Sequence, residues 1–357
     1  MNGPKERWKN KKRWLWGIVG LLLLIGLWQV ATSVYREEEK ELRRKIRESV
    51  KETFPEQTAT FFQSFGLFYF PSDQKMPEEA ILSRRSVVLI HGLDDPGKVW
   101  QNLAPELVKA DFNVWLMHYP NDQPIVESAR LLFEEMKRLN QIGIQRVSIV
   151  AHSMGGLVSR EMLTSPEMAY EKAAKDRQVP DVDSLTMVGT PNHGSQLARF
   201  RVFAEVRDQF ARLTKGEASW LGGVLDGAGE AKIDLLPGSQ FLTELNARPH
   251  PAEVDQMVIA GITSPWTEGE IKNVLVRLNE HVPKNGQTQI NALGDQMISM
   301  THGLGDGLVS VESTRLDGIP HRTVKGTHLS MIRNITQDSQ RTPPAVPIIV
   351  DRLRKEE

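Results

Sequence analysis

The chain has 357 residues, a formal net charge of −1 and no cysteine. This near-neutral balance differs from that of a typical nucleic-acid-binding protein, which is strongly basic, so we expect no nucleic-acid partner. Without cysteine the protein can form no disulfide, no thiolate nucleophile and no Cys-based metal site, and it cannot carry a lipid on cysteine. The length predicts about two domains, or one large α/β domain with insertions.

Residues 14–35 form an apolar segment without a charged side chain. A helix of this length reaches about 33 Å, which is enough to cross the hydrocarbon core of a bilayer. Tryptophan and tyrosine side chains lie near both ends of the segment, where membrane proteins place them. The segment is long for a cleaved signal peptide, and nothing polar marks the exposed face of an ordinary core helix. We therefore predict a transmembrane signal anchor.

Basic residues flank this segment on both sides, six in the tail over residues 1–13 and seven between Arg36 and Lys51. Lysine and arginine counts alone therefore do not decide the orientation. The short tail with undiluted charge favours an N-terminus inside and a body exported across a bacterial inner membrane. Residues 36–57 contain Glu/Lys and Glu/Arg pairs at helical spacing, which predicts a solvated helical spacer between membrane and body.

From residue 58 to residue 357, short apolar runs alternate with amphipathic segments. Buried strands are predicted at 86–90, 114–117, 147–150, 185–188 and 257–260. Helices are predicted at 99–109, 125–139 and 154–163. Such an alternation indicates an α/β domain whose mostly parallel central sheet is covered by helices on both faces. Ligands bind at the carboxyl ends of the strands in sheets of this kind.

The predicted strand at 147–150 leads into the sequence Ala151-His152-Ser153-Met154-Gly155-Gly156. A serine between a strand and a helix, with small neighbours, is typical of a nucleophile elbow, in which a strained corner exposes the hydroxyl above the sheet. The helix that follows directs backbone N–H groups toward the reaction centre. We therefore predict Ser153 as a nucleophile. The neighbouring His152 is predicted to point away and pack.

The first predicted strand ends in His91-Gly92-Leu93. A tight glycine-bearing turn at this position can supply one backbone donor of an oxyanion hole, and the residue after the nucleophile supplies the other. We assign these donors to the N–H groups of Leu93 and Met154. His91 is interpreted as a structural histidine that supports the loop.

An acid and a base complete the predicted site. Asp306 lies in the glycine-rich turn 303–310, and His328 follows the strand-like residues 321–325. Alone, each would be interpreted as a turn aspartate or a surface histidine. In the order Ser153, Asp306, His328, they predict a catalytic triad. No His-x-x-x-His or paired-carboxylate pattern indicates a metal, and we expect no metal and no cofactor.

Together these motifs resemble those of the α/β-hydrolase superfamily, and within it the lipase-like serine esterases that include bacterial triacylglycerol lipases and GPI inositol-deacylase-like proteins. The resemblance covers residues 85–335 and includes the string Val188-Gly189-Thr190-Pro191-Asn192-His193-Gly194-Ser195. It implies an α/β-hydrolase fold and cofactor-free hydrolysis of acyl-ester or lipid substrates. Before residue 86 only a faint strand signal occurs, at 66–70, so we expect the antiparallel edge strands common in this fold to be missing.

Two alternatives stay open at this level. Residues 196–246 occupy a position that carries a lid in many members of this fold, but an ordinary packing helix plus loop fits equally well. The same triad could also act on thioesters or amides, and a hydrolase fold can serve as a non-catalytic binding protein. The sequence does not assign an oligomeric state, an acyl chain length or a headgroup.

Overall fold

The computed structural model describes residues 36–70, 84–93, 97–120, 122–195, 230–263, 268–279, 303–336 and 339–355, with the single positions 72, 74, 75, 95, 287, 291, 295 and 298. The predicted basic tail 1–13 and transmembrane segment 14–35 lie outside these residues. In the described ranges, no helix combines the length and the apolar character needed to cross a membrane.

The described residues form an eight-stranded sheet with the order β2-β1-β4-β3-β5-β6-β7-β8. Its strands are β1 (Gly66–Phe70), β2 (Gln74–Lys75), β3 (Ser86–Ile90), β4 (Asn113–His118), β5 (Arg146–His152), β6 (Asp181–Val188), β7 (Asp255–Ile262) and β8 (His321–Lys325). Neighbouring strands from β4 to β8 pair in parallel. The predicted mostly parallel sheet is therefore confirmed.

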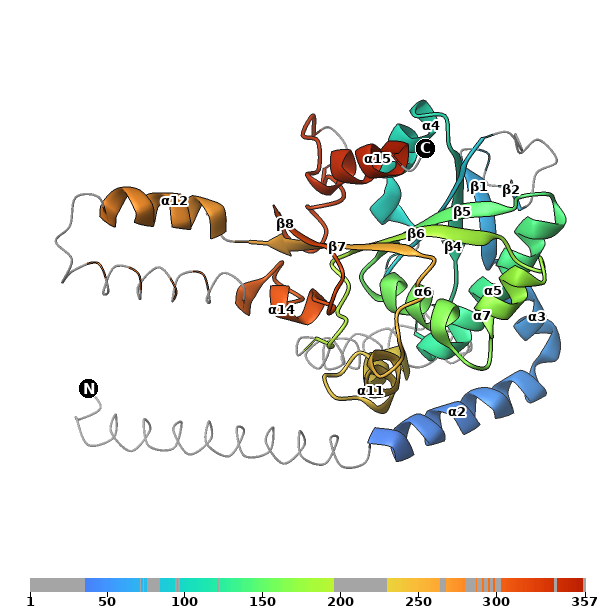
Figure 1. The fold of residues 1–357 in the computed structure, drawn as a ribbon. Helices are drawn as coiled ribbons and strands as arrows, with labels where there is room; N and C mark the ends of the chain where they lie inside the picture. Colours follow the sequence, from blue (N-terminus) through green and yellow to red (C-terminus); the bar gives the residue numbers. More distant parts are fainter. Residues whose placement is uncertain are drawn as a thin grey trace, which may run out of the picture.

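Helices cover both faces of the sheet (Figure 1). The main helices are α4 (Leu103–Lys109), α5 (Ile125–Gln141), α6 (Met154–Thr164), α7 (Tyr170–Lys175), α12 (Glu268–Asn279), α14 (Val311–Thr314) and α15 (Ala345–Lys355), with a 3₁₀ turn η1 (Lys98–Trp100). Side chains alternate along β3, as they must in a strand buried on both faces. Val88 packs in the core with α5 and α6, whereas Val87 and Leu89 pack with α4 and α15.

Antiparallel edge strands are present, which corrects the expectation that they would be missing. β1 pairs antiparallel with β4, with Phe68 opposite Leu116, and β2 pairs antiparallel with β1. Only two of the five residues in β1 are fully buried, because this strand lies near the edge of the sheet. Its sequence therefore lacks the continuous apolar run of a central strand buried on both faces. β2 is too short to form a recognisable pattern.

The charged segment predicted as a solvated spacer forms helix α2 (Arg36–Thr53), followed by α3 (Pro55–Gln63). One face of α2 is not solvated, however, since Arg47 is only 1% exposed. Its guanidinium lies 2.6 Å from a Glu127 carboxylate oxygen on α5. This helix therefore packs on the α/β body instead of standing apart from it.

The predicted lid, residues 196–246, is only partly described, since residues 196–229 lie outside the described ranges. Residues 230–246 form α10 (Glu230–Asp234) and α11 (Gln240–Asn246). Phe241, Leu242 and Leu245 of α11 are buried in the same core cluster as α6. In this part of the segment α11 therefore packs on the core, and the lid stays a prediction.

Candidate active site

Ser153 lies at the corner between β5 and α6, with φ of 53° and ψ of −127°. A positive φ is uncommon for a residue with a side chain and stores strain, which occurs most often at functional sites. The Ser153 N–H donates to Val188 O of β6 at 2.8 Å. This bond fixes the corner against the neighbouring strand. The serine side chain itself is half-buried, at the carboxyl edge of the sheet. The backbone has the geometry expected of a nucleophile elbow.

Glycine is required on three sides of this corner. A Cβ on Gly155 would lie 2.3 Å from Ile90 O of β3, and one on Gly156 would lie 2.1 Å from Thr190 Oγ1. A Cβ on Gly92 would lie 2.6 Å from Ser153 Cβ. All three distances are shorter than van der Waals contact allows. The turn after β3 therefore approaches the serine closely, and α6 begins directly against the strands.

This close approach brings together the two segments that carry the predicted oxyanion donors. Met154 is the first residue of α6, so its N–H has no carbonyl one turn earlier in the helix to bond. Leu93 follows Gly92, where an added Cβ would lie 2.6 Å from Ser153 Cβ. The Leu93 and Met154 amides thus belong to segments next to the serine, and their assignment as oxyanion donors stays a prediction.

The side chain of His91 is bonded to this turn. It is buried, its Nδ1 donates to Gly92 O at 2.8 Å, and its ring stacks on Tyr119 with centroids 4.4 Å apart. The Tyr119 hydroxyl in turn donates to His91 O at 2.5 Å. Burial lowers the pKa of His91 to about 4, although its bond to Gly92 opposes this shift. A neutral, doubly held ring matches the structural role predicted for His91.

Asp306 and His328 form a buried pair, with Oδ2 of Asp306 2.7 Å from Nδ1 of His328. Their side chains are 1% and 8% exposed. The second carboxylate oxygen, Oδ1, accepts the N–H groups of Leu308 and Val309, each at 2.8 Å. One oxygen thus holds the aspartate in its own loop, and the other orients the imidazole. The backbone adds a further link, since His328 N–H donates to Asp306 O at 2.9 Å.

Sheet topology explains how residues distant in sequence reach one edge. Ser153 follows β5 directly, and the loop of His328 follows β8, with Gly326 N–H bonded to Ile262 O of β7 at 2.9 Å. Asp306 does not follow a strand immediately. Its loop is tied instead to the end of β7, because Thr263 N–H donates to Gly305 O at 2.7 Å. All three predicted triad residues therefore belong to the carboxyl edge of the parallel strands.

His152, which was predicted only to point away from the site and pack, makes a contact with the predicted base. His152, the last residue of β5, is 2% exposed, and its Nε2 lies 2.9 Å from His328 O. Its ring centroid lies 4.7 Å from that of His328. No local pattern predicts this contact, because the residue before the nucleophile is unspecified in the motif and only the fold brings residues 152 and 328 together.

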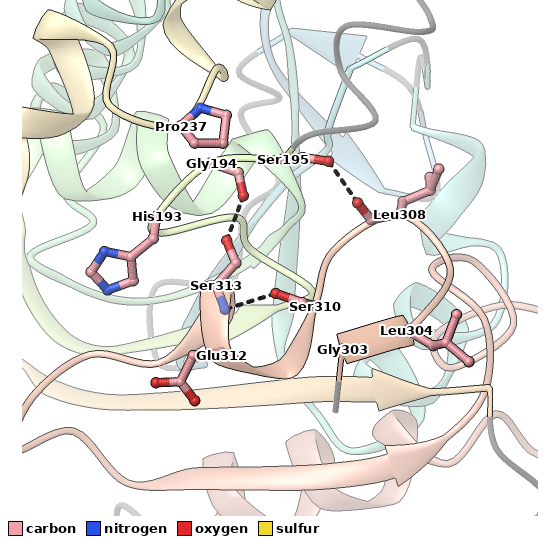
Figure 2. A pocket seen from close by; sticks show the side chains of 10 residues that line it. All are labelled: His193, Gly194, Ser195, Pro237, Gly303, Leu304, Leu308, Ser310, Glu312 and Ser313. Atoms are coloured by element: carbon pink, nitrogen blue, oxygen red, sulfur yellow. Dashed lines mark hydrogen bonds between the residues drawn. The ribbon is translucent and has the colours of Figure 1, made fainter. Parts of the chain in front are cut away.

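A cavity of about 510 Å³ lies beside the loop over residues 303–310 that carries Asp306 (Figure 2). It is lined by His193, Gly194, Ser195, Pro237, Gly303, Leu304, Leu308, Ser310, Glu312 and Ser313. Ser195 Oγ donates to Leu308 O at 2.6 Å, and Ser313 Oγ donates to Gly194 O at 2.5 Å. These bonds join the segment after β6 to the loop that holds Asp306. The described part of the chain holds no cluster of three or more carboxylate and imidazole groups that could bind a metal ion.

Comparisons with known proteins give limited sequence similarity. Residues 123–293, less than half of the chain, match the model of a domain of unknown function, DUF7379. A triacylglycerol lipase of Pseudarthrobacter phenanthrenivorans is 27% identical over 129 residues, which are 33% of this chain and 36% of that protein. The chain therefore matches only about a third of the length of this curated relative.

Solved structures show the fold more completely. A metagenomic carboxyl esterase is similar with a TM-score of 0.51 and 18% identity, over 80% of this chain and 79% of that one. The lipase of Staphylococcus hyicus is similar with a TM-score of 0.50 and 16% identity, over 79% of this chain and 98% of that one. With its sheet order and strand-end site, the chain has an α/β-hydrolase fold similar to that of lipases and esterases. The predicted resemblance is confirmed at the level of the fold.

Proposed function

We propose that this chain is a serine hydrolase that cleaves carboxylic esters, with Ser153 as nucleophile, His328 as base and Asp306 as the acid that orients the base. The observation that carries this proposal is the buried hydrogen bond of 2.7 Å between Asp306 and His328, at the same sheet edge as the strained Ser153 corner. Each of the three residues has many possible structural roles alone, but a nucleophile elbow beside an aspartate–histidine pair is the arrangement that acyl transfer requires.

The geometry suggests a mechanism in two steps. Because Asp306 engages Nδ1 of His328, Nε2 is the nitrogen available to take the proton of Ser153. The Ser153 oxygen would then bond to the ester carbonyl carbon, and the carbonyl oxygen would become an oxyanion held by the Leu93 and Met154 N–H groups. When this tetrahedral intermediate collapses, the bond between the carbonyl carbon and the alcohol oxygen breaks, and the alcohol leaves with the proton from His328. Water, activated by the same histidine, then releases the acid and restores Ser153.

We further propose that the substrate is an acyl ester or lipid and that the protein acts at a membrane. Support for the substrate comes from the curated relative, which is named a triacylglycerol lipase. Support for the membrane comes from the uncharged apolar segment 14–35. In this proposal the N-terminus lies inside and the catalytic body is exported. No cofactor enters the mechanism, since serine, histidine and aspartate supply all of its proton transfers.

The test of the catalytic proposal combines covalent labelling with turnover by the full-length protein. A fluorophosphonate probe should label the wild type, and Ser153→Ala should abolish both labelling and hydrolysis of p-nitrophenyl esters. Ser49→Ala, which changes an exposed serine of α2, serves as the control and should behave as wild type. Undiminished labelling or turnover in Ser153→Ala would contradict the assignment, and an unlabelled wild type would favour a non-catalytic binding protein.

A matched panel of substrates tests the bond that is cleaved. Esters, thioesters and anilides with the same acyl chains should be turned over with the highest kcat/KM for the ester. Preference for the thioester or the anilide would replace the proposed reaction with thioester or amide hydrolysis by the same triad.

A topology reporter tests on which side of the membrane the body lies. Fused after residue 357 and active only on the exported side, the reporter should be active. An inactive reporter in stably inserted protein would place the body inside.

A further inference from the structure

We propose that His152 is a positioning residue that holds the loop of His328 against the nucleophile corner by donating an Nε2–H hydrogen bond to the His328 carbonyl oxygen. This inference rests on the proposed function, because it assigns His328 the role of the base. It adds a residue to the site that neither the triad nor the oxyanion hole includes.

The direction of the hydrogen bond follows from its acceptor. Nε2 of His152 lies 2.9 Å from His328 O, and a carbonyl oxygen can only accept, so Nε2 carries the proton. The other ring nitrogen, Nδ1, is buried without a hydrogen-bond partner among the described residues. A neutral ring protonated on Nε2 satisfies both observations. Burial and the nearby His328 ring also lower the pKa of His152 well below its ordinary value.

This tautomer excludes a role for His152 as the catalytic base. Its Nε2 proton is donated to the His328 carbonyl oxygen, and its buried Nδ1 forms no hydrogen bond with a described residue. His328, by contrast, has a carboxylate partner on Nδ1. The neutral state of His152 also matters, because a charged ring with its centroid 4.7 Å from that of His328 would oppose the imidazolium that forms during acyl transfer.

The sheet topology explains why such a contact is needed. β5, which carries Ser153, and β8, which precedes His328, are separated by β6 and β7. At the usual strand spacing this separation is roughly 14 Å, so the His328 loop must cross two strands to reach the serine. Two backbone hydrogen bonds hold this loop on the side away from β5, from Gly326 N–H to Ile262 O of β7 and from His328 N–H to Asp306 O. His152 provides a hydrogen bond from the strand that carries the nucleophile itself.

Three contacts therefore hold His328 from different directions. The Asp306 carboxylate bonds the ring, the Asp306 carbonyl accepts the backbone N–H, and the His152 ring donates to the backbone carbonyl. Loss of the third contact leaves the base attached to the acid but free to shift relative to Ser153. A displacement of about 1 Å between reacting groups can lower the rate about 100-fold. The expected loss is therefore in kcat and not in substrate affinity.

Three substitutions separate the hydrogen bond from the packing of the ring. His152→Gln carries its amide nitrogen the same number of bonds from Cα as Nε2, so it can restore the donor. His152→Asn has the same chemistry but is one bond too short, and His152→Met fills the space without a donor. In the full-length protein we expect His152→Gln to keep kcat within about threefold of wild type. We expect His152→Asn and His152→Met to lose about 10- to 100-fold in kcat, with KM changed less than about twofold.

The outcomes distinguish this proposal from the proposed function and from a purely structural role. Wild-type kcat in a folded His152→Met or His152→Asn protein would overturn the positioning role and leave the triad intact. An equal loss in all three variants, including His152→Gln, would show that ring packing matters and not the donor. Melting temperatures of the variants should not follow the kcat order. If wild type hydrolyses no ester, thioester or amide and Ser153 takes no label, both proposals fall together.

Discussion

Arg47 of α2 and Glu230 of α10 form an ion pair in which a guanidinium nitrogen lies 3.1 Å from a carboxylate oxygen, and their side chains are 2% and 0% exposed. Arg47 also pairs with Glu127 of α5. A second ion pair joins α2 to α10, between Lys40 and Asp234 at 2.5 Å. Helix α2, which follows the predicted membrane anchor, is therefore attached to the body through α10. Helix α10 begins at residue 230, directly after the undescribed residues 196–229 of the predicted lid.

Arg47→Ala should detach α2 from the body. Removing one partner of a buried ion pair leaves the other charge unpaired, and such changes cost about 3–5 kcal/mol. Arg44→Ala is the matched control, since Arg44 is on the same helix but pairs with Glu41 and Glu48 at the exposed surface. Hydrogen exchange should accelerate across residues 36–53 in Arg47→Ala and stay near wild type in Arg44→Ala. Unchanged protection in Arg47→Ala would contradict the anchoring role of Arg47.

Glu230→Gln should remove a pH dependence of stability. Burial raises the pKa of Glu230 from 4.5 to about 7, although the nearby Arg47 opposes this shift. Between these pH values the folded protein holds a proton that the unfolded chain has released, so the free energy of unfolding falls as pH rises. The charged groups facing Glu230 are Arg47 and Lys40 from α2, Glu127 from α5 and Asp234 from α10.

Glutamine imitates the protonated carboxyl group, so the difference between wild type and Glu230→Gln isolates this one titration. Denaturant unfolding at pH 5 should give similar stabilities for both proteins. At pH 8 wild type should be the less stable of the two. A difference that stays constant from pH 5 to pH 8 would show that the pKa of Glu230 is not raised.

The sequence predicted those elements whose residue pattern matches their burial in the folded protein. The strands β3 to β7 are apolar because they are buried on both faces, so their positions could be recognised without the structure. The elbow at Ser153 could be recognised for a similar reason, since its geometry needs glycines at fixed neighbouring positions. By contrast, β1 and β2 were missed or faint because half-buried edge strands have short and mixed patterns.

Features that depend on long-range contact could not be predicted. Among the described side chains of α2, Arg47 is buried against the body, while Leu42 and Ile46 are 59% and 48% exposed. A rule that places apolar residues inward would therefore have oriented this helix wrongly, and only the partners on α5 and α10 explain the buried charge. The contact from His152 to His328 joins residues 176 positions apart, and no local pattern marks it.

Leu245→Ala tests whether α11 belongs to the core or to a mobile lid. Leu245 is 1% exposed and packs in the cluster that includes α6. Truncation of a core leucine leaves a cavity and costs about 2–5 kcal/mol. Leu42→Ala makes the same change at an exposed position of α2 and should cost much less. Equal small losses in denaturant unfolding would indicate that α11 is not part of the cooperative core.

Deletion of residues 200–225 tests the lid hypothesis for the remaining segment. These residues lie before α10 and outside the described ranges, and a lid over the acyl pocket would select among substrates by chain length. Full-length protein and deletion variant should therefore differ in their relative kcat/KM for short and long p-nitrophenyl esters. The same ratio in both proteins, with the fold retained, would contradict the lid.

Gly155→Ala should damage both stability and the candidate site, because the methyl group has no room at the start of α6. The added Cβ would lie 2.3 Å from Ile90 O and 2.6 Å from His91 O. Both atoms belong to the backbone at the end of β3, so relief requires α6 to move away from the sheet, which costs about 1–3 kcal/mol or more. That movement also displaces the Met154 N–H from its predicted place in the oxyanion hole.

The matched control is Gly269→Ala in α12, where an added Cβ would meet nothing within 4 Å. Alanine is the better helix former by about 1 kcal/mol, so this variant should be unchanged or slightly more stable. For Gly155→Ala we expect a lower melting temperature and at least a tenfold loss of kcat, and for Gly269→Ala wild-type kcat. Ester hydrolysis at the wild-type rate by Gly155→Ala would mean that α6 does not need to begin against β3 for the reaction.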